Sequence, residues 1–544
     1  MAASKIFHSL PSTYEQSAWS VKRVRTDNSE KLVDYIVLAE FDIDTGSTVR
    51  HQYPCAITGY KEDWFAENML PEGAHKHEQD WTYMFLNRME KQLDEDFYIY
   101  PSSVEQNACD DPNKRFLYGI NLVRNKADSS VRRGAVVKAM ALFSRYHFCE
   151  IFRQPLVLAL DKYYSNPSID VLEELYNCLN DLSLQNCPRP TIIEQSLMCR
   201  GISASARVSC LSSECSSACN SDYVLRDYTP SRWVNSLSVS LFNKEVPLNI
   251  SLHTSPDDIG VANLSYFLKI FRESSMKIFN GVLTKKRVLF VGYDHAAGDV
   301  CQMVLSAVSM VAPPLANVIK RAFPYANLSD LSFLEVDGFI AGVTNPMFQQ
   351  HSEWWDLLCV LDLSNGRGTV QTAEEVRVEE AAQKGKQYVP TPRPASESAH
   401  EGMDAKFIAR VLSGLEAHLC EDWVKLQFHE YTQDILLQAL DSKHNDLIGY
   451  SGGNSSSIRL SESVHKSMEA NSHRVNILRN ESEFKALPGN PWTWCSSDGG
   501  ESDSEKVDGE VLLSQLRRLQ IEQDLDDMEV EAIFSLLDRG LVSE

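Results

Sequence analysis

Residues 286–348 constrain the fold of this chain more than any other stretch. Residues 287–293 form a short apolar run that closes near Gly292, which is typical of a strand buried on both faces. Residues 299–311 carry apolar side chains at a period of about 3.6 residues, which predicts a buried helix. Residues 339–348 predict a strand that runs directly into a turn. Strand, helix and strand in this order indicate an α/β fold.

The length and charge of the chain limit the number of domains and the kinds of partner that we expect. A chain of 544 residues is too long for one ordinary core, so we expect two or three domains. The formal net charge of −23 argues against a general binder of nucleic acid or anionic lipid, because its field repels phosphate. No apolar run reaches the roughly 18 residues of a transmembrane helix, and no signal peptide is predicted. The 13 cysteines follow no disulfide framework, which favours a cytoplasmic protein with reduced thiols.

Changes in composition divide the first half of the chain into three parts. Residues 1–31 are polar and predict a flexible tail. Residues 32–185 alternate strand and helix patterns and predict a first α/β domain, although residues 135–144 suit a strand or a helix equally. Residues 186–232 are rich in serine and cysteine and predict a linker. The cysteines of that linker lack the paired CxxC spacing of a zinc site, so no metal is expected there.

The second half of the chain repeats the α/β pattern and then becomes helical. Residues 233–364 predict a second α/β domain, which opens with strands at 237–242 and 246–252 and has helices at 257–271 and 273–283. Residues 365–402 predict an acidic linker with little apolar surface to bury. Residues 403–544 predict a helical region that contains a mobile loop at 441–505.

The sequence shows no signature of a catalytic or cofactor site. It lacks a phosphate-binding P-loop, a G-x-G-x-x-G fingerprint, a G-x-S-x-G elbow and an H-E-x-x-H motif, so no catalytic residue and no cofactor are predicted. His75 and His77 suit a solvated loop better than a metal site. Arg132 and Arg133 precede Gly134, and two alternatives fit them: a clamp for a carboxylate or phosphate, or a surface turn.

Several short motifs occur in an order that resembles the DENN module. They are MLPEGAH at 69–75, RRGA at 132–135, FPY at 323–325, GVTNP at 342–346 and EWWD at 353–356. The resemblance covers residues 32–363 and is closest to the polarity-axis-stabilising, Arf-GTPase-interacting DENN proteins. It implies a longin-like N-terminal α/β domain, an α/β DENN core domain and a helical C-terminal part. It also implies that residues 135–144 are a strand.

The resemblance implies a regulator that binds a small GTPase of the Rab or Arf class. The main expectation is a guanine-nucleotide exchange factor for a Rab-type GTPase in membrane traffic, which would bind the nucleotide-free GTPase best. The alternative is a non-catalytic adaptor that binds an Arf-type GTPase at the cell cortex in polarity. Either protein would be cytoplasmic and recruited to the plasma membrane or vesicles through its partner. A metabolic enzyme is a third alternative, because an α/β core does not fix function.

The expected GTPase contacts lie in three places in the sequence. Four of them are near the end of the strand predicted at 339–346, two lie on a hairpin predicted from strands at 32–41 and 48–54, and the paired arginines form the third group. Strand alternation places the two hairpin residues on opposite faces. The strand-end prediction fails if its two polar residues, Thr344 and Asn345, are buried and bonded internally. The full set is Asp337, Phe339, Thr344, Asn345, Tyr35, Glu40, Arg132 and Arg133.

Overall fold

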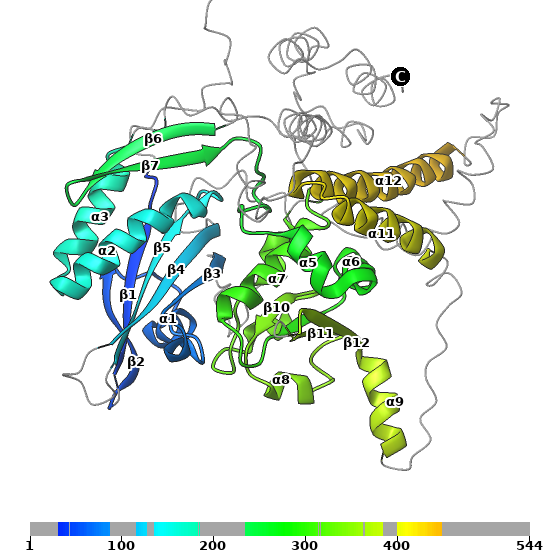
Figure 1. The fold of residues 1–544 in the computed structure, drawn as a ribbon, viewed down its shortest axis with the longest axis horizontal. Helices are drawn as coiled ribbons and strands as arrows, with labels where there is room; N and C mark the ends of the chain where they lie inside the picture. The colour runs from blue at the N-terminus through cyan, green and yellow to red at the C-terminus, as the bar shows by residue number, and fades with distance from the viewer. Residues whose placement is uncertain are drawn as a thin grey trace, which may run out of the picture.

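A computed structural model describes residues 31–42, 44–87, 116–127, 135–182, 184, 234–313, 315, 317–362, 365–383 and 400–448. Residues 1–30 of the tail predicted at 1–31, the linker at 186–232 and Arg132 and Arg133 lie outside these residues, as do residues 449–544. The described part contains two five-stranded sheets, a two-stranded hairpin and a pair of C-terminal helices (Figure 1). The predicted α/β class is therefore confirmed.

The N-terminal sheet is antiparallel and has the order β2-β1-β5-β4-β3. Residues 135–144 form its central strand, β5, as the resemblance implied. This strand pairs with β1 on one side and β4 on the other, which explains why Ala139, Met140 and Ala141 are buried. The five strands are β1 (Tyr35–Asp42), β2 (Gly46–Tyr53), β3 (Gln79–Asn87), β4 (Phe116–Ala127) and β5 (Ala135–Ser144).

Helices cover both faces of the N-terminal sheet (Figure 1). Alternation along β1 sends Ile36 and Leu38 into the core beneath α2 and α3, and sends Val37 and Ala39 into the core beneath α1. The β6–β7 hairpin, which was expected to open the second domain, contacts α3 and the 3-10 turn at Cys149–Phe152. The elements are α1 (Glu62–Met69), α2 (Arg153–Ser165), α3 (Asp170–Asn180), β6 (Val234–Leu241) and β7 (Lys244–Ser251).

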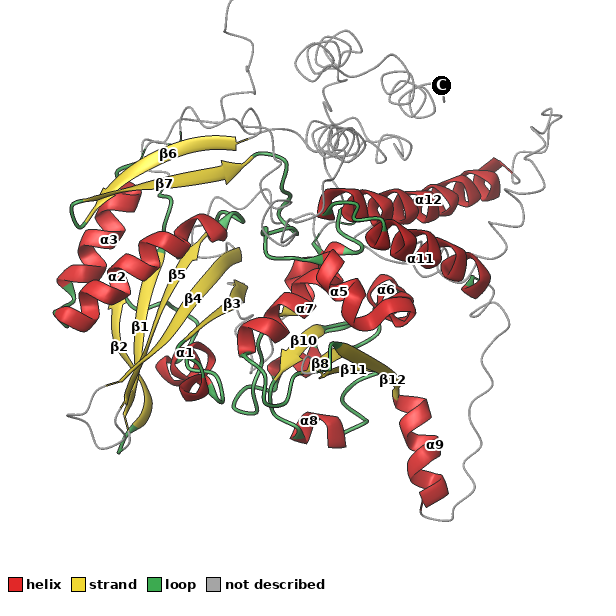
Figure 2. Ribbon diagram, viewed as in Figure 1, coloured by secondary structure: helices red, strands yellow, loops and turns green. Residues whose placement is uncertain are grey.

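The central sheet has the order β12-β11-β8-β10-β9. Strands β8 to β11 are parallel and β12 is an antiparallel edge strand. Every residue of β8 and β10 is buried, as expected for strands covered on both faces. Figure 2 shows α5, α6 and α7 on one side of this sheet and the short α8 on the other. The strands are β8 (Val288–Val291), β9 (Ala322–Phe323), β10 (Ile340–Val343), β11 (Leu357–Asp362) and β12 (Arg367–Thr372), and the helices are α5 (Leu264–Phe271), α6 (Ser275–Leu283), α7 (Ala297–Ser309) and α8 (Met347–Gln350).

Three predictions for the second half differ from the structure. The helix predicted from residue 257 begins only at Leu264, because the carboxylate of Asp257 accepts backbone N–H groups of another loop and Asn263 caps the helix. The expected acidic linker contains β12 and α9 (Ala373–Gln383). The helical region predicted from residue 403 begins with two helices, α11 (Glu401–Glu416) and α12 (Glu421–Ile448), so residues 441–448, which were predicted to belong to a mobile loop, are helical.

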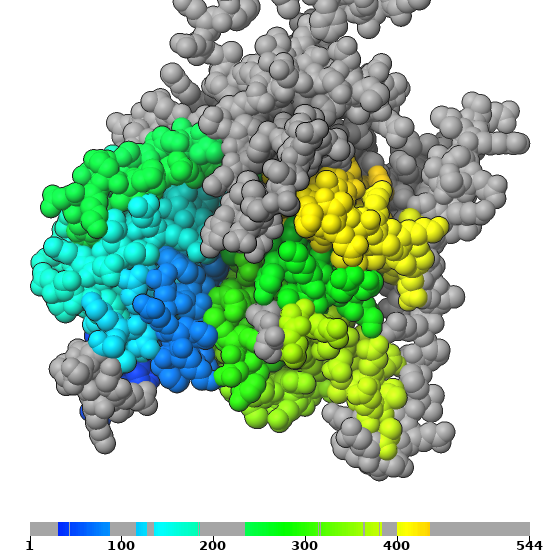
Figure 3. Space-filling view, in the orientation of Figure 1, coloured from blue at the N-terminus to red at the C-terminus, as the bar shows by residue number. Residues whose placement is uncertain are grey.

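The N-terminal sheet and the central sheet share a hydrophobic core. One cluster of buried side chains includes Leu38 and Leu142 of the first sheet, Val288 of the second, and Phe428 of α12. In Figure 3 the blue surface of the N-terminal part meets the green central part along a continuous boundary. None of the described helices is long and apolar enough to cross a membrane.

Candidate functional site

The carboxyl ends of the parallel strands face the segment that joins α1 to β3. We call this contact between residues 64–80 and residues 294–345 the sheet junction. Trp64 Nε1 donates a hydrogen bond to Asp330 Oδ2 at 2.6 Å, and the backbone N–H of Glu72 donates to the Tyr325 hydroxyl at 3.0 Å. Lys76 forms an ion pair with Asp294. Segments that are far apart in the sequence therefore form one continuous surface at this edge of the central sheet.

Asp80 of β3 caps the N-terminus of α7 across the sheet junction. The backbone N–H of Gly298 donates to Asp80 Oδ1 at 3.1 Å and to Oδ2 at 3.2 Å. A helix N-terminus has free N–H groups and a positive end, so a carboxylate stabilises it. Burial raises the pKa of Asp80, and the backbone N–H groups oppose that shift. A Cβ at Gly298 would lie 2.4 Å from Asp80 Oδ1, so the close approach requires glycine.

The structure corrects the strand-end prediction at two of its residues. Phe339 is fully buried among the aromatic side chains of the core on the α8 side of the sheet, so it cannot contact a partner. Thr344 is only 7% exposed, and its side chain forms a hydrogen bond with Tyr325. Both residues were expected at the surface because the sequence does not show what covers the end of β10.

The two polar residues that remain in the strand-end prediction lie at opposite ends of β10. Asn345 follows the strand and is half-buried, and its Nδ2 donates to both carboxylate oxygens of Glu72 at 3.1 Å. It therefore holds the sheet junction together rather than standing free. Asp337 is exposed but precedes β10, at the amino edge of the sheet. The structure does not bring Asp337 and Asn345 onto one surface.

The hairpin residues lie away from the sheet junction. Glu40 forms ion pairs with Lys138 and with Arg50, whose Nε lies 3.2 Å from Glu40 Oε2. Its carboxylate also raises the pKa of Tyr163 on α2, although burial is the larger cause. Tyr35 packs on the opposite face, against the core under α1. The expected separation of these two residues is observed, and neither joins the strand-end residues.

His75 and His77 lie in the loop on the N-terminal side of the sheet junction. The backbone carbonyl of His75 accepts a hydrogen bond from Asn125 Nδ2 at 2.7 Å. Within the described ranges, no group of three or more His, Cys, Asp or Glu side chains is arranged to hold a metal ion. Burial raises the pKa of the Cys149, Cys301 and Cys359 thiols, which keeps them protonated and unreactive.

Sequence analysis missed a group of exposed apolar side chains at the carboxyl edge of the central sheet. Five large hydrophobic residues are exposed in the part of the chain that the structure describes. Three of them lie in loops after β8 and β9, and a fourth, Met347, begins the short helix α8 after β10. These strands are neighbours in the sheet, so their loops are adjacent. We call these four residues the carboxyl-edge patch; they are Tyr293, Leu328, Leu331 and Met347. The fifth is Ile169, which precedes α3.

Exposed or half-buried acidic side chains occur on both sides of the sheet junction. Glu67 and Glu72 are exposed on the N-terminal side. Asp294 follows Tyr293, and Asp330 lies between the two leucines of the patch. Among the described residues, the hydrogen-bond partners of the Glu72 and Asp330 carboxylates include an amide and an indole, which are neutral groups. An apolar centre with an acidic border is an arrangement that binds another protein rather than a small anion.

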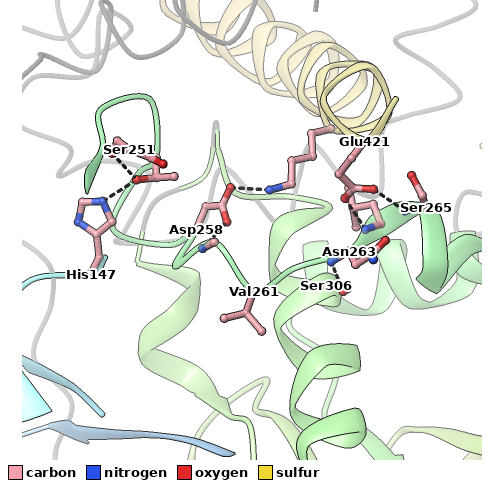
Figure 4. Close-up of polar contacts among 12 residues, drawn as sticks. His147, Ser251, Asp258, Val261, Asn263, Ser265, Ser306 and Glu421 are labelled. Atoms are coloured by element: carbon pink, nitrogen blue, oxygen red, sulfur yellow. Dashed lines mark hydrogen bonds and ion pairs between the residues drawn. The ribbon is translucent and has the colours of Figure 1, made fainter. Parts of the chain in front are cut away.

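A second polar cluster fastens α12 to the central helices (Figure 4). Glu421 accepts hydrogen bonds from the backbone N–H groups of Leu264 at 2.5 Å and Ser265 at 2.8 Å, which caps α5. Lys425 Nζ lies 2.8 Å from Asp258 Oδ2. Burial opposes the charged form of Lys425, but Asp258 and Glu421 raise its pKa above the usual value. Because these charges satisfy one another inside the protein, the cluster is structural.

A histidine of the N-terminal part reaches the loop that carries Asp258 (Figure 4). His147 Nε2 lies 3.1 Å from Thr254 Oγ1. Burial lowers the pKa of His147 to about 4, so the ring is neutral near pH 7. A neutral, hydrogen-bonded ring in this position contributes to packing between the loop at 253–263 and the first sheet, where it also contacts the ring of Tyr118.

Two family models match different sides of the sheet junction. The docking domain of Afi1 for Arf3 in vesicle trafficking matches residues 35–102, which include β1, β2, α1 and β3. The family described as stabilization of polarity axis matches residues 262–372, which include the whole central sheet. An AFI1-like protein of Schizosaccharomyces pombe is 25% identical over an alignment of 373 residues, which covers 61% of this chain. The chain spans 58% of that relative's length.

These matches overturn the DENN-module assignment. The families that match are the polarity-axis and Afi1 families, and no DENN domain is found. Neither matching description names a longin domain, a Rab GTPase or nucleotide exchange. The Arf and polarity parts of the expectation agree with the two descriptions. The short DENN-like motifs were misleading because several of them, including GVTNP and EWWD, fall on core and junction positions that serve packing.

Proposed function

We propose that this chain is a non-catalytic adaptor that binds a small GTPase of the Arf type in polarity and vesicle traffic. The observation that carries the proposal is the match of residues 35–102 to a domain that docks Arf3. The polarity-axis match on residues 262–372 supports the same role, and the sheet junction joins the two matched regions. An adaptor replaces the Rab exchange factor as the main hypothesis.

The charge of the chain supports recruitment through a partner. A net charge of −23 opposes direct adsorption to an anionic membrane surface. A lipid-anchored or membrane-bound GTPase would overcome that repulsion by supplying the membrane contact itself. The adaptor would then collect at the cell cortex or on vesicles wherever the active GTPase is present. Binding selects the GTP-loaded state only if the surface has a higher affinity for that state.

A panel of purified Arf and Rab GTPases tests this function. Each GTPase is immobilised in its GTP-analogue, GDP and nucleotide-free forms and exposed to the full chain, and release of a fluorescent nucleotide is followed in parallel. An adaptor binds an Arf-type GTPase in the GTP-analogue form and does not accelerate release. Preference for the nucleotide-free form with faster release would instead identify an exchange factor. Retention by no member, or equal retention of all three forms, would refute the adaptor.

A further inference from the structure

The carboxyl-edge patch is exposed on backbone that the fold holds in place. Asn345, which precedes Met347 by two positions, is bonded to Glu72, and its Oδ1 accepts the backbone N–H of Met347 at 2.9 Å. Asp330 accepts a hydrogen bond from Trp64 and another from the backbone N–H of Ser332 at 2.9 Å. The loops are therefore fixed by contacts on their inner side while their apolar side chains point outward. A preordered apolar surface binds with a small entropic cost.

The degree of exposure distinguishes this patch from ordinary surface. Single exposed apolar residues are normal on a folded protein. Here Tyr293 is 64% exposed and Met347 is 44% exposed, and they follow neighbouring strands that pair at Val291 and Val343. Leu328 and Leu331 lie in the loop after β9, the next strand in the sheet. In a parallel sheet, the region outside the carboxyl ends of the strands is the usual place for a binding site.

The border of the carboxyl-edge patch defines the chemistry of its partner. Glu67, Glu72, Asp294 and Asp330 contribute four carboxylates, and Lys76 offsets one of them through its ion pair with Asp294. A complementary surface has an apolar centre and basic side chains at its edge. Because the border includes residues from both matched regions, a partner centred on the patch would contact both of them at once.

We infer that the carboxyl-edge patch is the surface on which the Arf-type GTPase docks. This inference rests on the proposed function and adds the location, the apolar centre and the basic edge that the GTPase must present. It places the GTPase contact on the exposed residues of the carboxyl-edge patch. Phe339, Thr344 and Asn345, which were predicted to make this contact, are buried or hydrogen-bonded within the protein. Those three residues support the patch from inside the protein.

Substitutions in the full chain test the location. We expect the double variant Tyr293→Ala/Met347→Ser, and separately Leu331→Ser, to weaken binding of a GTP-analogue-loaded Arf GTPase by about tenfold or more. The matched control is Ile169→Ser, which removes an apolar side chain that is 42% exposed just before α3, and its binding should equal that of the unmodified chain. Glu67→Lys should weaken binding and reduce its dependence on salt. Thermal melting of each variant verifies folding.

The outcomes separate this inference from the proposed function. If the unmodified chain binds no Arf-type GTPase, the proposed function fails and the inference fails with it. If the unmodified chain binds but the patch variants bind equally well, the function stands and the location is wrong. Equal weakening by Ile169→Ser would also refute the location. A patch-dependent dimer of the chain, seen by light scattering without any GTPase, would assign the surface to self-association instead.

Discussion

Removal of the Asp80 carboxylate should loosen the sheet junction. Asp80 is 8% exposed and accepts N–H groups of Gly298 at the start of α7 and of Trp81 in its own strand. Loss of a helix-capping side chain costs about 0.5–2 kcal/mol, and an unsatisfied buried N–H costs about 1–3 kcal/mol. Burial of the carboxylate is itself unfavourable, as its raised pKa shows, and offsets part of that gain. We therefore expect Asp80→Ala to lower stability by about 1–2 kcal/mol.

Amide hydrogen exchange at the first turn of α7 measures this effect where it occurs. Exchange in that turn should become about five- to thirtyfold faster in Asp80→Ala, as a change of 1–2 kcal/mol implies. The matched variant Asp80→Asn keeps the volume and one oxygen acceptor, so its exchange should rise less. Unchanged exchange in Asp80→Ala, or equal effects of the two substitutions, would refute the assignment of Asp80 as a cap across the sheet junction.

The raised pKa of Asp80 also predicts a pH dependence with a definite sign. Its folded-state pKa lies above the ordinary value of 3.8, mainly because of burial. The folded protein therefore holds this proton more tightly than the unfolded chain. The stability that comes from this tighter proton binding is fully present below pH 3.8 and is lost as the pH rises through the folded-state pKa of Asp80. The free energy of unfolding of the unmodified chain, relative to that of Asp80→Asn, should therefore decrease over this pH range. Urea unfolding across the acid range measures this difference.

Two further predictions concern packing and buried charge. Gly298→Ala should destabilise the chain by about 1–3 kcal/mol because the new Cβ would lie 2.4 Å from Asp80 Oδ1, whereas Gly402→Ala, with open space around it, should not. Comparable melting temperatures for the two variants would contradict the close approach. Lys425→Met should destabilise the chain by about 1–3 kcal/mol, because it leaves Asp258, whose side chain is only 12% exposed, without its cation. A loss below about 1 kcal/mol in urea unfolding would show that the pair is not a buried one.

The sequence predicted the α/β core well because its signals are local. The apolar run of β8 and the period of α7 both reflect burial of neighbouring residues, and the structure places both elements as expected. Residues 135–144 were different, because secondary-structure propensity alone did not decide between a strand and a helix. Pairing on both sides decides its state, and such pairing lies beyond local sequence.

The candidate site could not be predicted in the same way because it forms between distant segments. Asn345 and Glu72 are separated by 273 positions, and nothing local to either residue indicates their contact. Thr344 looked exposed because its partner Tyr325 reaches it only in the folded chain. Conversely, nothing local to Leu328, Leu331 and the other patch residues indicates that they are exposed, and only the sheet order places them at one edge of the central sheet.

Equilibrium titration of the full chain with an Arf-type GTPase in two nucleotide states tests the central claim most directly. The account predicts a Kd for the GTP-analogue form at least tenfold below that for the GDP form, which corresponds to about 1.4 kcal/mol of selectivity. It also predicts that Tyr293→Ala/Met347→Ser removes most of that selectivity while Ile169→Ser retains it. Equal Kd values for the two nucleotide states, or no binding of either, would contradict an adaptor for the active GTPase.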